Sequence, residues 1–391
     1  MVDKDNYSAE EICTHLGDDY HRFDGAVVPP IYQNSLFVFE NFNGLINALD
    51  NERENYLYSR GTNPSIEIAE QKIAALEGGE ICKLFSSGMA AITSSLLSFL
   101  EKGDHVLMVS NIYGPTRKLL NYLDKFGIEF STTKTTNNEE IESNIKSNTK
   151  VIYLESPTTM TFELVDLHAV SKIAKAYGVK TIIDNTWATP INQTPISMGI
   201  DLVVHSASKY LSGHSDLIGG AIIGNTEMMN KIFYNEFQLF GGVMPPFEAW
   251  LLLRGLRTLP LRMKEHMASA MKIANFLQKH NKVKKVNYPG LTGNDDYELG
   301  KKMLKGYSGL LSFELKKNDF KTVEKFIDSL KIFKIGVSWG GFESLVLSPN
   351  HGNNEEDLIK EGVDPGLIRI SVGLEKYEAL LGDLDAALNK I

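Results

Sequence analysis

The sequence predicts an α/β protein with a large, mostly parallel sheet domain and a smaller C-terminal α+β domain. Short β-rich runs alternate with helical segments between about residues 67 and 224, as strands and crossover helices do in a parallel sheet. This alternation ends near Pro245. In addition, a chain of 391 residues that is 43% apolar can bury one large core and a second, smaller one.

The first two predicted parts are an arm, residues 1–60, and a large domain, residues 61–247. The arm shows little apolar periodicity, so we expect it to be extended and to reach toward another subunit. The expected strands of the large domain are residues 83–85, 105–109, 150–155, 180–184, 201–205 and 219–224. The expected helices include residues 90–100, 115–126 and 167–177, each apolar on one face. Right-handed crossovers should join these strands.

The third predicted part is the smaller domain, residues 248–391. A long helical stretch from Glu248 to about Lys279 leads into a strand-like run at residues 308–315. A helix near residues 321–330 and further strands up to residues 367–375 follow. This order predicts an α+β arrangement.

Composition excludes several classes of function. The net charge is −9, and basic residues form no block that could follow a phosphate backbone, so nucleic acid is not an expected partner. Cys13 and Cys82 are far apart and lie in no metal-binding pattern, so we expect neither a disulfide framework nor a metal site. The polar start lacks signal-peptide character, and no stretch approaches the roughly 18 apolar residues of a membrane span. We therefore expect a cytoplasmic protein without a membrane partner.

A lysine follows one of the expected strands directly. Residues 203–216 read VVHSASKYLSGHSD, so Lys209 lies just beyond a buried-looking strand, at the edge where open α/β sheets bind ligands. A lysine there can form a Schiff base, contact a phosphate or simply be a surface residue. From this string alone, a surface lysine is the commonest of the three.

Two further strands end in groups that suit a ligand with a cationic ring and an anionic phosphate. Asp184 ends the run KTIID, although a helix cap or turn is an equally common role for such a residue. Gly88 and Met89 begin a helix after another strand, which makes an anion site as well as an ordinary turn. Ser206 and Ser208 can add hydroxyl donors across the cleft.

The convergence of these groups at one sheet edge favours pyridoxal 5′-phosphate. Its ring nitrogen stays protonated against a carboxylate, and the protonated ring stabilises a carbanion of the substrate. Other nucleotide and phosphate motifs are absent from the sequence, including the P-loop and the strand-flanked G-x-G-x-x-G. His205 stands where a short-chain dehydrogenase would need tyrosine, and no G-x-S-x-G elbow of a serine hydrolase occurs.

Several motifs together resemble a known family. They are YSRGTNPS from Tyr58, SSGMAAI from Ser86, YGPT from Tyr113, ESPTTMTFEL from Glu155, DNTWATP from Asp184, SWGGFESL from Ser338 and LIRISVGLE from Leu367. In this order and spacing they are similar to the cystathionine lyase and synthase family of fold-type I pyridoxal phosphate enzymes, across nearly the whole chain. Within that family the chain looks most like the bacterial cystathionine β-lyases.

The resemblance implies a role for each matching residue. Lys209 would form the Schiff base and move protons, Asp184 would pair with the ring nitrogen, and Tyr113 would stack on the ring. The phosphate would be bound by Gly88, Met89, Ser206 and Ser208, and by Tyr58 and Arg60 of a neighbouring subunit in a homotetramer of two dimers.

Tyr113 and three residues of the smaller domain would bind the substrate, a sulfur amino acid. The resemblance implies that Arg369 binds the substrate carboxylate, that Ser338 helps to hold it and that Trp339 forms the pocket wall. Taken without the family, Arg369 is more often a surface ion-pair residue and Tyr113 a core aromatic.

Departures from the family pattern bear on which bond is cleaved. Thr159 and Met160 replace a common Asn-Pro, which leaves the usual ring-side asparagine contact without its residue. Val337 replaces the glutamate frequent in γ-cleaving cystathionine enzymes, Trp339 replaces leucine, and Pro115 replaces the cysteine of methionine γ-lyases. These differences favour β-elimination of L-cystathionine to homocysteine, pyruvate and ammonia, a step of methionine biosynthesis.

Three alternatives remain open from the sequence. The first is γ-lyase or γ-synthase chemistry on the same cofactor. The second, compatible with either lyase, is a racemase side activity on amino acids such as alanine, with Tyr58 or Tyr113 as a second proton donor. The third is a non-catalytic cofactor-binding protein, because fold alone does not imply turnover.

Overall fold

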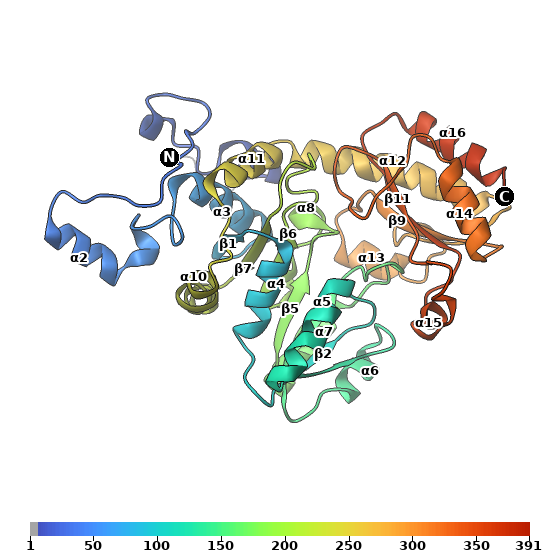
Figure 1. Ribbon diagram of the computed structural model, residues 1–391, viewed down its shortest axis with the longest axis horizontal. Coiled ribbons are helices and arrows are strands. Elements are labelled where there is room, and N and C mark those ends of the chain that lie inside the picture. The colour runs from blue at the N-terminus through green and yellow to red at the C-terminus, as the bar shows by residue number, and fades with distance from the viewer. Residues whose placement is uncertain (1–6) are drawn as a thin grey trace.

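The computed structural model describes residues 7–391, which form two β-sheets with their helices (Figure 1). The first six residues of the predicted arm lie outside the described residues. The large sheet lies at the centre of the molecule and the small sheet lies toward the C-terminus (Figure 1). Among residues 7–391, no helix combines the length and apolarity needed to cross a bilayer.

The arm is less extended than the sequence suggested, because it contains two short helices, α1 (Ala9–His15) and α2 (Phe42–Asp50). Seven and nine residues are too few to show a clear apolar period, but α1 begins with a capping box between Ser8 and Glu11. Lys72 holds this first part against the body through Asp18, at 3.2 Å. Helix α2 projects away from the body (Figure 1).

The large sheet has the order β1-β7-β6-β5-β4-β2-β3. Its strands are β1 (Ile81–Phe85), β2 (His105–Met108), β3 (Glu129–Thr132), β4 (Thr149–Glu155), β5 (Lys180–Asp184), β6 (Leu202–Ser206) and β7 (Gly220–Gly224). The predicted parallel arrangement is confirmed except at β7, which runs antiparallel to both of its neighbours. The segment between β6 and β7 contains no crossover helix, and a parallel pair needs one.

Edge strand β3 was not predicted, since its residues are half-buried or exposed and mostly polar. The helices around the large sheet are α3 (Pro64–Glu77), α4 (Gly88–Leu97), α5 (Gly114–Leu123), α6 (Asn138–Ser143), α7 (Leu167–Tyr177), α8 (Thr189–Asn192), α9 (Thr226–Ile232) and α10 (Gln238–Phe240). They cover both faces, so alternate residues of each central strand enter two separate apolar clusters. On β5, for example, Ile182 belongs to one cluster and Ile183 to the other.

The helical stretch predicted from Glu248 to Lys279 is two helices, α11 (Pro246–Leu256) and α12 (Leu259–Lys279). Pro260 lies in the first turn of α12, where its missing N–H costs nothing, and a proline there interrupts the preceding helix. Helix α12 then leads toward the small sheet (Figure 1).

The small sheet has the order β10-β11-β12-β9-β8. Its strands are β8 (Val283–Asn287), β9 (Leu310–Leu315), β10 (Lys334–Ile335), β11 (Leu345–Leu347) and β12 (Leu367–Ser371). The accompanying helices are α13 (Tyr297–Met303), α14 (Phe320–Ser329), α15 (Glu355–Lys360) and α16 (Tyr377–Leu388). The predicted α+β arrangement of this region is therefore confirmed.

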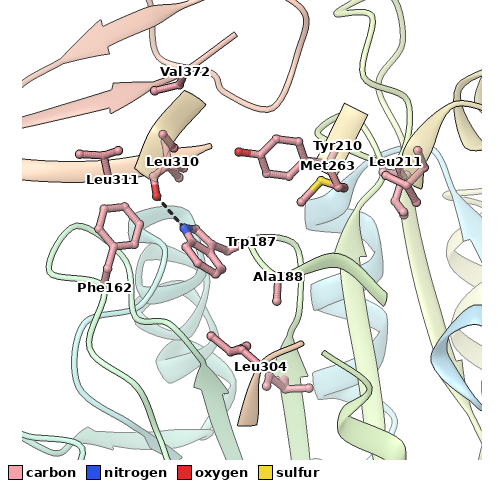
Figure 2. Packing of buried hydrophobic residues seen from close by; sticks show 14 of the residues in the cluster. Phe162, Trp187, Ala188, Tyr210, Leu211, Met263, Leu304, Leu310, Leu311 and Val372 are labelled. Atoms are coloured by element: carbon pink, nitrogen blue, oxygen red, sulfur yellow. Dashed lines mark hydrogen bonds between the residues drawn. The ribbon is translucent and has the colours of Figure 1, made fainter. Parts of the chain in front are cut away.

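Buried side chains join the two sheets into one core. Figure 2 shows Trp187, which follows β5, donating from Nε1 to the carbonyl oxygen of Leu310 in β9 at 2.9 Å. Phe162 packs beside it, with ring centres 6.3 Å apart. Tyr210 spans the same junction, since its hydroxyl accepts a hydrogen bond from the Gly309 N–H at 2.9 Å. These contacts fix the small sheet relative to the strand ends of the large sheet.

Candidate active site

A cavity of about 780 Å³ lies at the carboxyl ends of the large-sheet strands and is closed on one side by the small sheet. The carboxyl edge of a parallel sheet is where α/β folds bind ligands. All of the predicted site residues except Tyr58 and Arg60 line this cavity. The structure thus brings together side chains that lie up to about 280 residues apart in the sequence, from Gly88 to Arg369.

Lys209 lies three residues beyond the end of β6, and its Nζ donates a hydrogen bond to Ser338 Oγ at 2.7 Å. Burial lowers the pKa of Lys209, and the positive charge of Arg369 lowers it further, against the opposing effect of Asp184. Gly340 allows the Ser338 loop to approach, because its φ is +80° and a Cβ there would lie 3.1 Å from Lys209 Cβ.

Asp184 is the last residue of β5 and points into the cavity. Its Oδ1 accepts hydrogen bonds from the Thr186 N–H, at 3.0 Å, and from the Thr186 hydroxyl. Thr186 Oγ1 in turn accepts from the Ser206 N–H at 2.8 Å, which ties β5 to β6. Burial raises the pKa of Asp184, while Thr186 and the charges of His205 and Lys209 act to lower it.

Glu155, a residue that the sequence reasoning missed, ends β4 directly beside Asp184. Its Oε1 accepts a hydrogen bond from the Tyr113 N–H at 2.6 Å. Burial raises the pKa of Glu155 well above its usual range, and the neighbouring Asp184 raises it further. Its position at the end of a predicted strand was a signal that could have identified it.

Tyr113 precedes α5 and remains 46% exposed on the cavity wall. Burial of the remainder raises the pKa of its phenol, as do the carboxylates of Asp184 and Glu155, while Arg369 lowers it. At neutral pH the phenol therefore carries its proton and can donate it.

The amino end of α4 forms another part of the wall. Ser87 caps the helix by accepting from the Ala90 N–H at 3.0 Å, and the preceding N–H groups of Gly88 and Met89 have no intrahelical acceptor. Gly88 packs against Ser206, since an added Cβ would lie 3.0 Å from Ser206 Cβ.

The serine hydroxyls predicted to face this helix differ in their surroundings. Ser206 ends β6 opposite Gly88, whereas Ser208 Oγ accepts from the Gly219 N–H at 2.9 Å and donates to the Gly219 carbonyl at 3.3 Å. Both residues line the cavity. Ser208 therefore also fastens the Lys209 turn to the segment before β7.

Arg369 reaches the cavity from β12 of the small sheet. Its Nη2 donates to the carbonyl oxygens of Val337 and Ser338, at 3.1 and 3.3 Å. Burial lowers the pKa of Arg369 to about 10, and Tyr113 opposes this shift. Trp339 lies in the same loop, with its ring centre 5.6 Å from Lys209 Nζ.

Tyr58 and Arg60 do not line the cavity of their own chain. Both are exposed on the arm, where the Arg60 guanidinium carbon lies 5.4 Å from the centre of the Tyr58 ring. Their predicted action in a neighbouring subunit stays a prediction. Further cavity residues that the sequence reasoning did not select are Ser87, Glu155, Thr186, Ser215 and Glu343.

The residues present fit pyridoxal phosphate. The cofactor requires an amine, a carboxylate for its ring nitrogen and an anion site for its phosphate. Lys209 Nζ, Asp184 and the amino end of α4 meet these needs in one cavity. Asp184 Oδ2 accepts no hydrogen bond from any residue between 7 and 391 and so remains available. The fold and the cavity define a pyridoxal phosphate-dependent enzyme.

Comparison with known proteins identifies the family. The model of the Cys/Met metabolism PLP-dependent enzyme family matches residues 10–389. The chain therefore belongs to this family, as the sequence motifs predicted.

Individual relatives differ in activity. The chain is 41% identical over 374 residues to an L-methionine gamma-lyase of Fusobacterium nucleatum, covering 94% of each chain. It is 40% identical over 382 residues to a cystathionine beta-lyase of Lactococcus lactis, covering 96% of this chain and 97% of the relative. The crystal structure of metB from Corynebacterium glutamicum superposes with a TM-score of 0.91 at 34% identity, covering 99% of each chain. These comparisons leave the choice between β- and γ-cleavage open.

Proposed function

We propose that the protein is a carbon–sulfur lyase that cleaves L-cystathionine by β-elimination to homocysteine, pyruvate and ammonia, in methionine biosynthesis. The main support for a lyase function comes from the contacts of the loop of residues 337–339. This loop accepts the Lys209 hydrogen bond at Ser338 Oγ and the Arg369 hydrogen bonds at its carbonyl oxygens. One short segment thus fixes an amine base and a carboxylate-binding guanidinium relative to each other.

In this proposal the large-sheet strand ends hold the cofactor. Lys209 would bond it through Nζ, Asp184 would pair with its ring nitrogen, and Tyr113 would contact the ring. Gly88, Met89 and the hydroxyls of Ser206 and Ser208 would bind its phosphate. When bound, the cofactor supplies a protonated ring that accepts negative charge from the substrate α-carbon.

The chain's own residues then orient the substrate and move protons. Arg369 binds the substrate α-carboxylate, for which its fork of N–H donors is suited, and Ser338 keeps the carboxylate region in place. The Lys209 amine would remove the α-proton of the substrate. Lys209 or the Tyr113 phenol donates a proton to the departing sulfur.

Wall residues favour β- over γ-cleavage. Val337 and Trp339 present apolar surface beside Lys209. Position 337 therefore has no carboxylate that could bind the distal ammonium group of a substrate oriented for γ-cleavage. Thr159 replaces the asparagine expected beside the ring and also lines the cavity.

The experiment is product analysis with purified, cofactor-loaded protein and L-cystathionine. We expect pyruvate and homocysteine in equal amounts, and loss of turnover by a factor of about 10³ or more in Lys209→Ala. Formation of 2-oxobutyrate and cysteine would instead establish γ-cleavage. Absence of any keto acid from cystathionine, cystine or methionine would leave the non-catalytic alternative.

A racemase side activity would use the same proton transfers. It requires an acid on the face of the substrate opposite Lys209, and the Tyr113 phenol is the cavity residue that can serve, with Tyr58 of a neighbouring subunit as the other candidate. Incubation of optically pure L-alanine tests it. Alanine that stays optically pure excludes the side activity without affecting the lyase proposal.

We further propose a homotetramer of two dimers. The arm between residues 27 and 49 exposes large apolar side chains, including Val38 and Phe42 at 88% and 74%. Many exposed large apolar side chains in one segment are typical of an interface. A neighbouring subunit packed there would receive Tyr58 and Arg60 at its phosphate site.

A further inference from the structure

A buried polar cluster lies behind the proposed cofactor site, on the other face of the large sheet. Val204 of β6 is the register partner of Asp184, so the next residue, His205, points to the opposite face. There His205 Nε2 lies 2.6 Å from Glu77 Oε1, at the end of α3. Both side chains are completely buried.

Two amides complete the cluster. Asn185, which directly follows Asp184, donates from Nδ2 to Glu77 Oε1 at 2.8 Å and to the Gln193 carbonyl at 3.0 Å. Gln193 is also fully buried. The cluster is therefore attached to the chain at Asn185, the residue after Asp184, and at His205 of the neighbouring strand β6.

Folding stability does not explain this cluster. Five of its buried polar atoms have no hydrogen-bond partner among residues 7–391: Glu77 Oε2, Asn185 Oδ1, both Gln193 side-chain atoms and His205 Nδ1. Unpartnered buried polar atoms destabilise a fold, and apolar side chains of similar size would fill such a site at lower cost. A role toward the adjacent site accounts for these residue types.

We propose that Glu77 and His205 form a positioning pair that fixes strand β6 and Asn185 behind Asp184 and so keeps this carboxylate ionised opposite the cofactor ring nitrogen. The inference rests on the proposed function, in which Asp184 faces that nitrogen. A buried imidazole 2.6 Å from a carboxylate is a charge-assisted contact, which fixes the orientation of the ring. Glu77 is thus the anchor for both His205 of β6 and Asn185, the residue after Asp184.

The electrostatics of the described residues agree with this arrangement. Burial raises the pKa of Asp184, and the charges that lower it come from His205 and Lys209. Titratable groups packed near the pair include Cys82 of β1, whose buried thiol has its pKa raised well above the usual range, chiefly by burial, and Glu70 and Lys83, which act on that thiol.

The pair bears on where one proton resides. An ionised Asp184 leaves the proton on the ring nitrogen, whereas a protonated Asp184 leaves that nitrogen neutral. A rise of about one unit in the pKa of this carboxylate changes the ratio of the two proton positions by about tenfold.

The test is the ¹⁵N chemical shift of the ring nitrogen in full-length protein loaded with ring-labelled pyridoxal phosphate, measured by solid-state NMR. We expect a protonated ring nitrogen in the wild type and a shift toward the neutral value in both His205→Gln and Glu77→Gln. The two changes combined should shift it no further than His205→Gln alone, because the residues act as a pair. If either variant fails to fold, the other still carries the test.

The matched control is His105→Asn. His105 is equally buried in the same sheet but lies at the opposite, amino end of β2, bonded to Ser131 and Thr149. It should lower thermal stability without moving the ¹⁵N shift, which separates a positioning role from a structural one.

Two outcomes are distinguishable. In the first, His205→Gln and Glu77→Gln both keep the wild-type ¹⁵N shift while Asp184→Asn shows a neutral ring nitrogen. This result disproves the positioning role of Glu77 and His205 but leaves the proposed function intact. A wild-type shift in Asp184→Asn overturns the proposed orientation of the cofactor, and with it this inference.

Discussion

At the scale of single residues, the cavity gathers basic and acidic side chains within a small volume. Lys209 and Arg369 face Asp184 and Glu155, and each group perturbs its neighbours. Burial and Arg369 lower the pKa of Lys209, so more of its amine is unprotonated at neutral pH, as nucleophilic attack on a carbonyl requires. The guanidinium that we propose to bind the substrate thus also acts on the lysine.

Glu155 leads to a prediction about stability and pH. Its pKa in the folded protein lies well above the ordinary value of 4.5, first because of burial and then because of Asp184. The unfolded chain releases this proton near 4.5 and the folded chain holds it, so the stabilising contribution is present below that pH and is lost as pH rises toward the folded pKa. Glu155→Gln mimics the protonated form and removes the loss.

The measurement is the Tm of Glu155→Gln and wild type between about pH 5 and pH 8. The variant should gain on the wild type steadily as pH rises, and the glutamine carbonyl can still accept from the Tyr113 N–H. Glu101→Gln, the same change at an exposed position, serves as the control and should show no such trend. A difference in Tm that is constant with pH would show that Glu155 is ionised in the folded protein.

At the scale of elements, the strand ends and the start of α4 create the site, because parallel strands bring their carboxyl ends to one edge. Gly88 is the critical position at α4. An added Cβ would lie 3.0 Å from Ser206 Cβ and 3.2 Å from its Oγ, so Gly88→Ala must push the helix start away from β6. We expect the cofactor dissociation constant to rise about tenfold, measured by fluorescence titration of the apoprotein.

The control for this change is Gly382→Ala in α16, where an added Cβ meets nothing within 4 Å. It should leave cofactor affinity unchanged and raise stability slightly, because alanine favours helix over glycine. Equal cofactor affinity in Gly88→Ala and wild type would mean that the phosphate does not bind at the amino end of α4.

The elements that sequence reasoning identified share one physical signature. Buried strands such as residues 150–155 and 201–205 are apolar runs flanked by turn residues, and they lie where the pattern placed them. Edge strand β3 escaped prediction because its residues are mostly polar and partly exposed, and the orientation of β7 depends on a connection that local sequence does not specify. Similarly, Lys209 and Asp184 follow strands and were found, whereas the importance of Glu155 depends on pairing with Asp184 across the sheet.

At the scale of the whole molecule, the cavity needs both sheets but is not completed by the arm of the same chain. Arg369 and Ser338 come from the small-sheet part, while Lys209 and Asp184 come from the large-sheet part, and Trp187 and Tyr210 fasten the two (Figure 2). The arm instead projects from the opposite side of the large-sheet part (Figure 1). Tyr58 and Arg60 therefore lie away from the cavity of their own chain, as the proposed sharing of sites between subunits requires.

Shared sites predict that defective subunits restore each other. Coexpression of Arg60→Ala chains with Lys209→Ala chains should form mixed dimers in which one site combines an intact Lys209 with an intact Arg60 from the partner. With random pairing, half of the dimers are mixed and each holds one intact site of two, so roughly a quarter of wild-type activity should return.

Coexpression of Asp184→Asn with Lys209→Ala is the matched control. Both residues line the cavity of one chain, so every site in a mixed dimer retains one defect and no activity should return. Activity is followed as pyruvate release from L-cystathionine, with tagged chains to verify that mixed assemblies form. Recovery in neither pair, with mixed assemblies present, would mean that Arg60 serves its own chain or no site at all, and the arm would then have only a structural role in assembly.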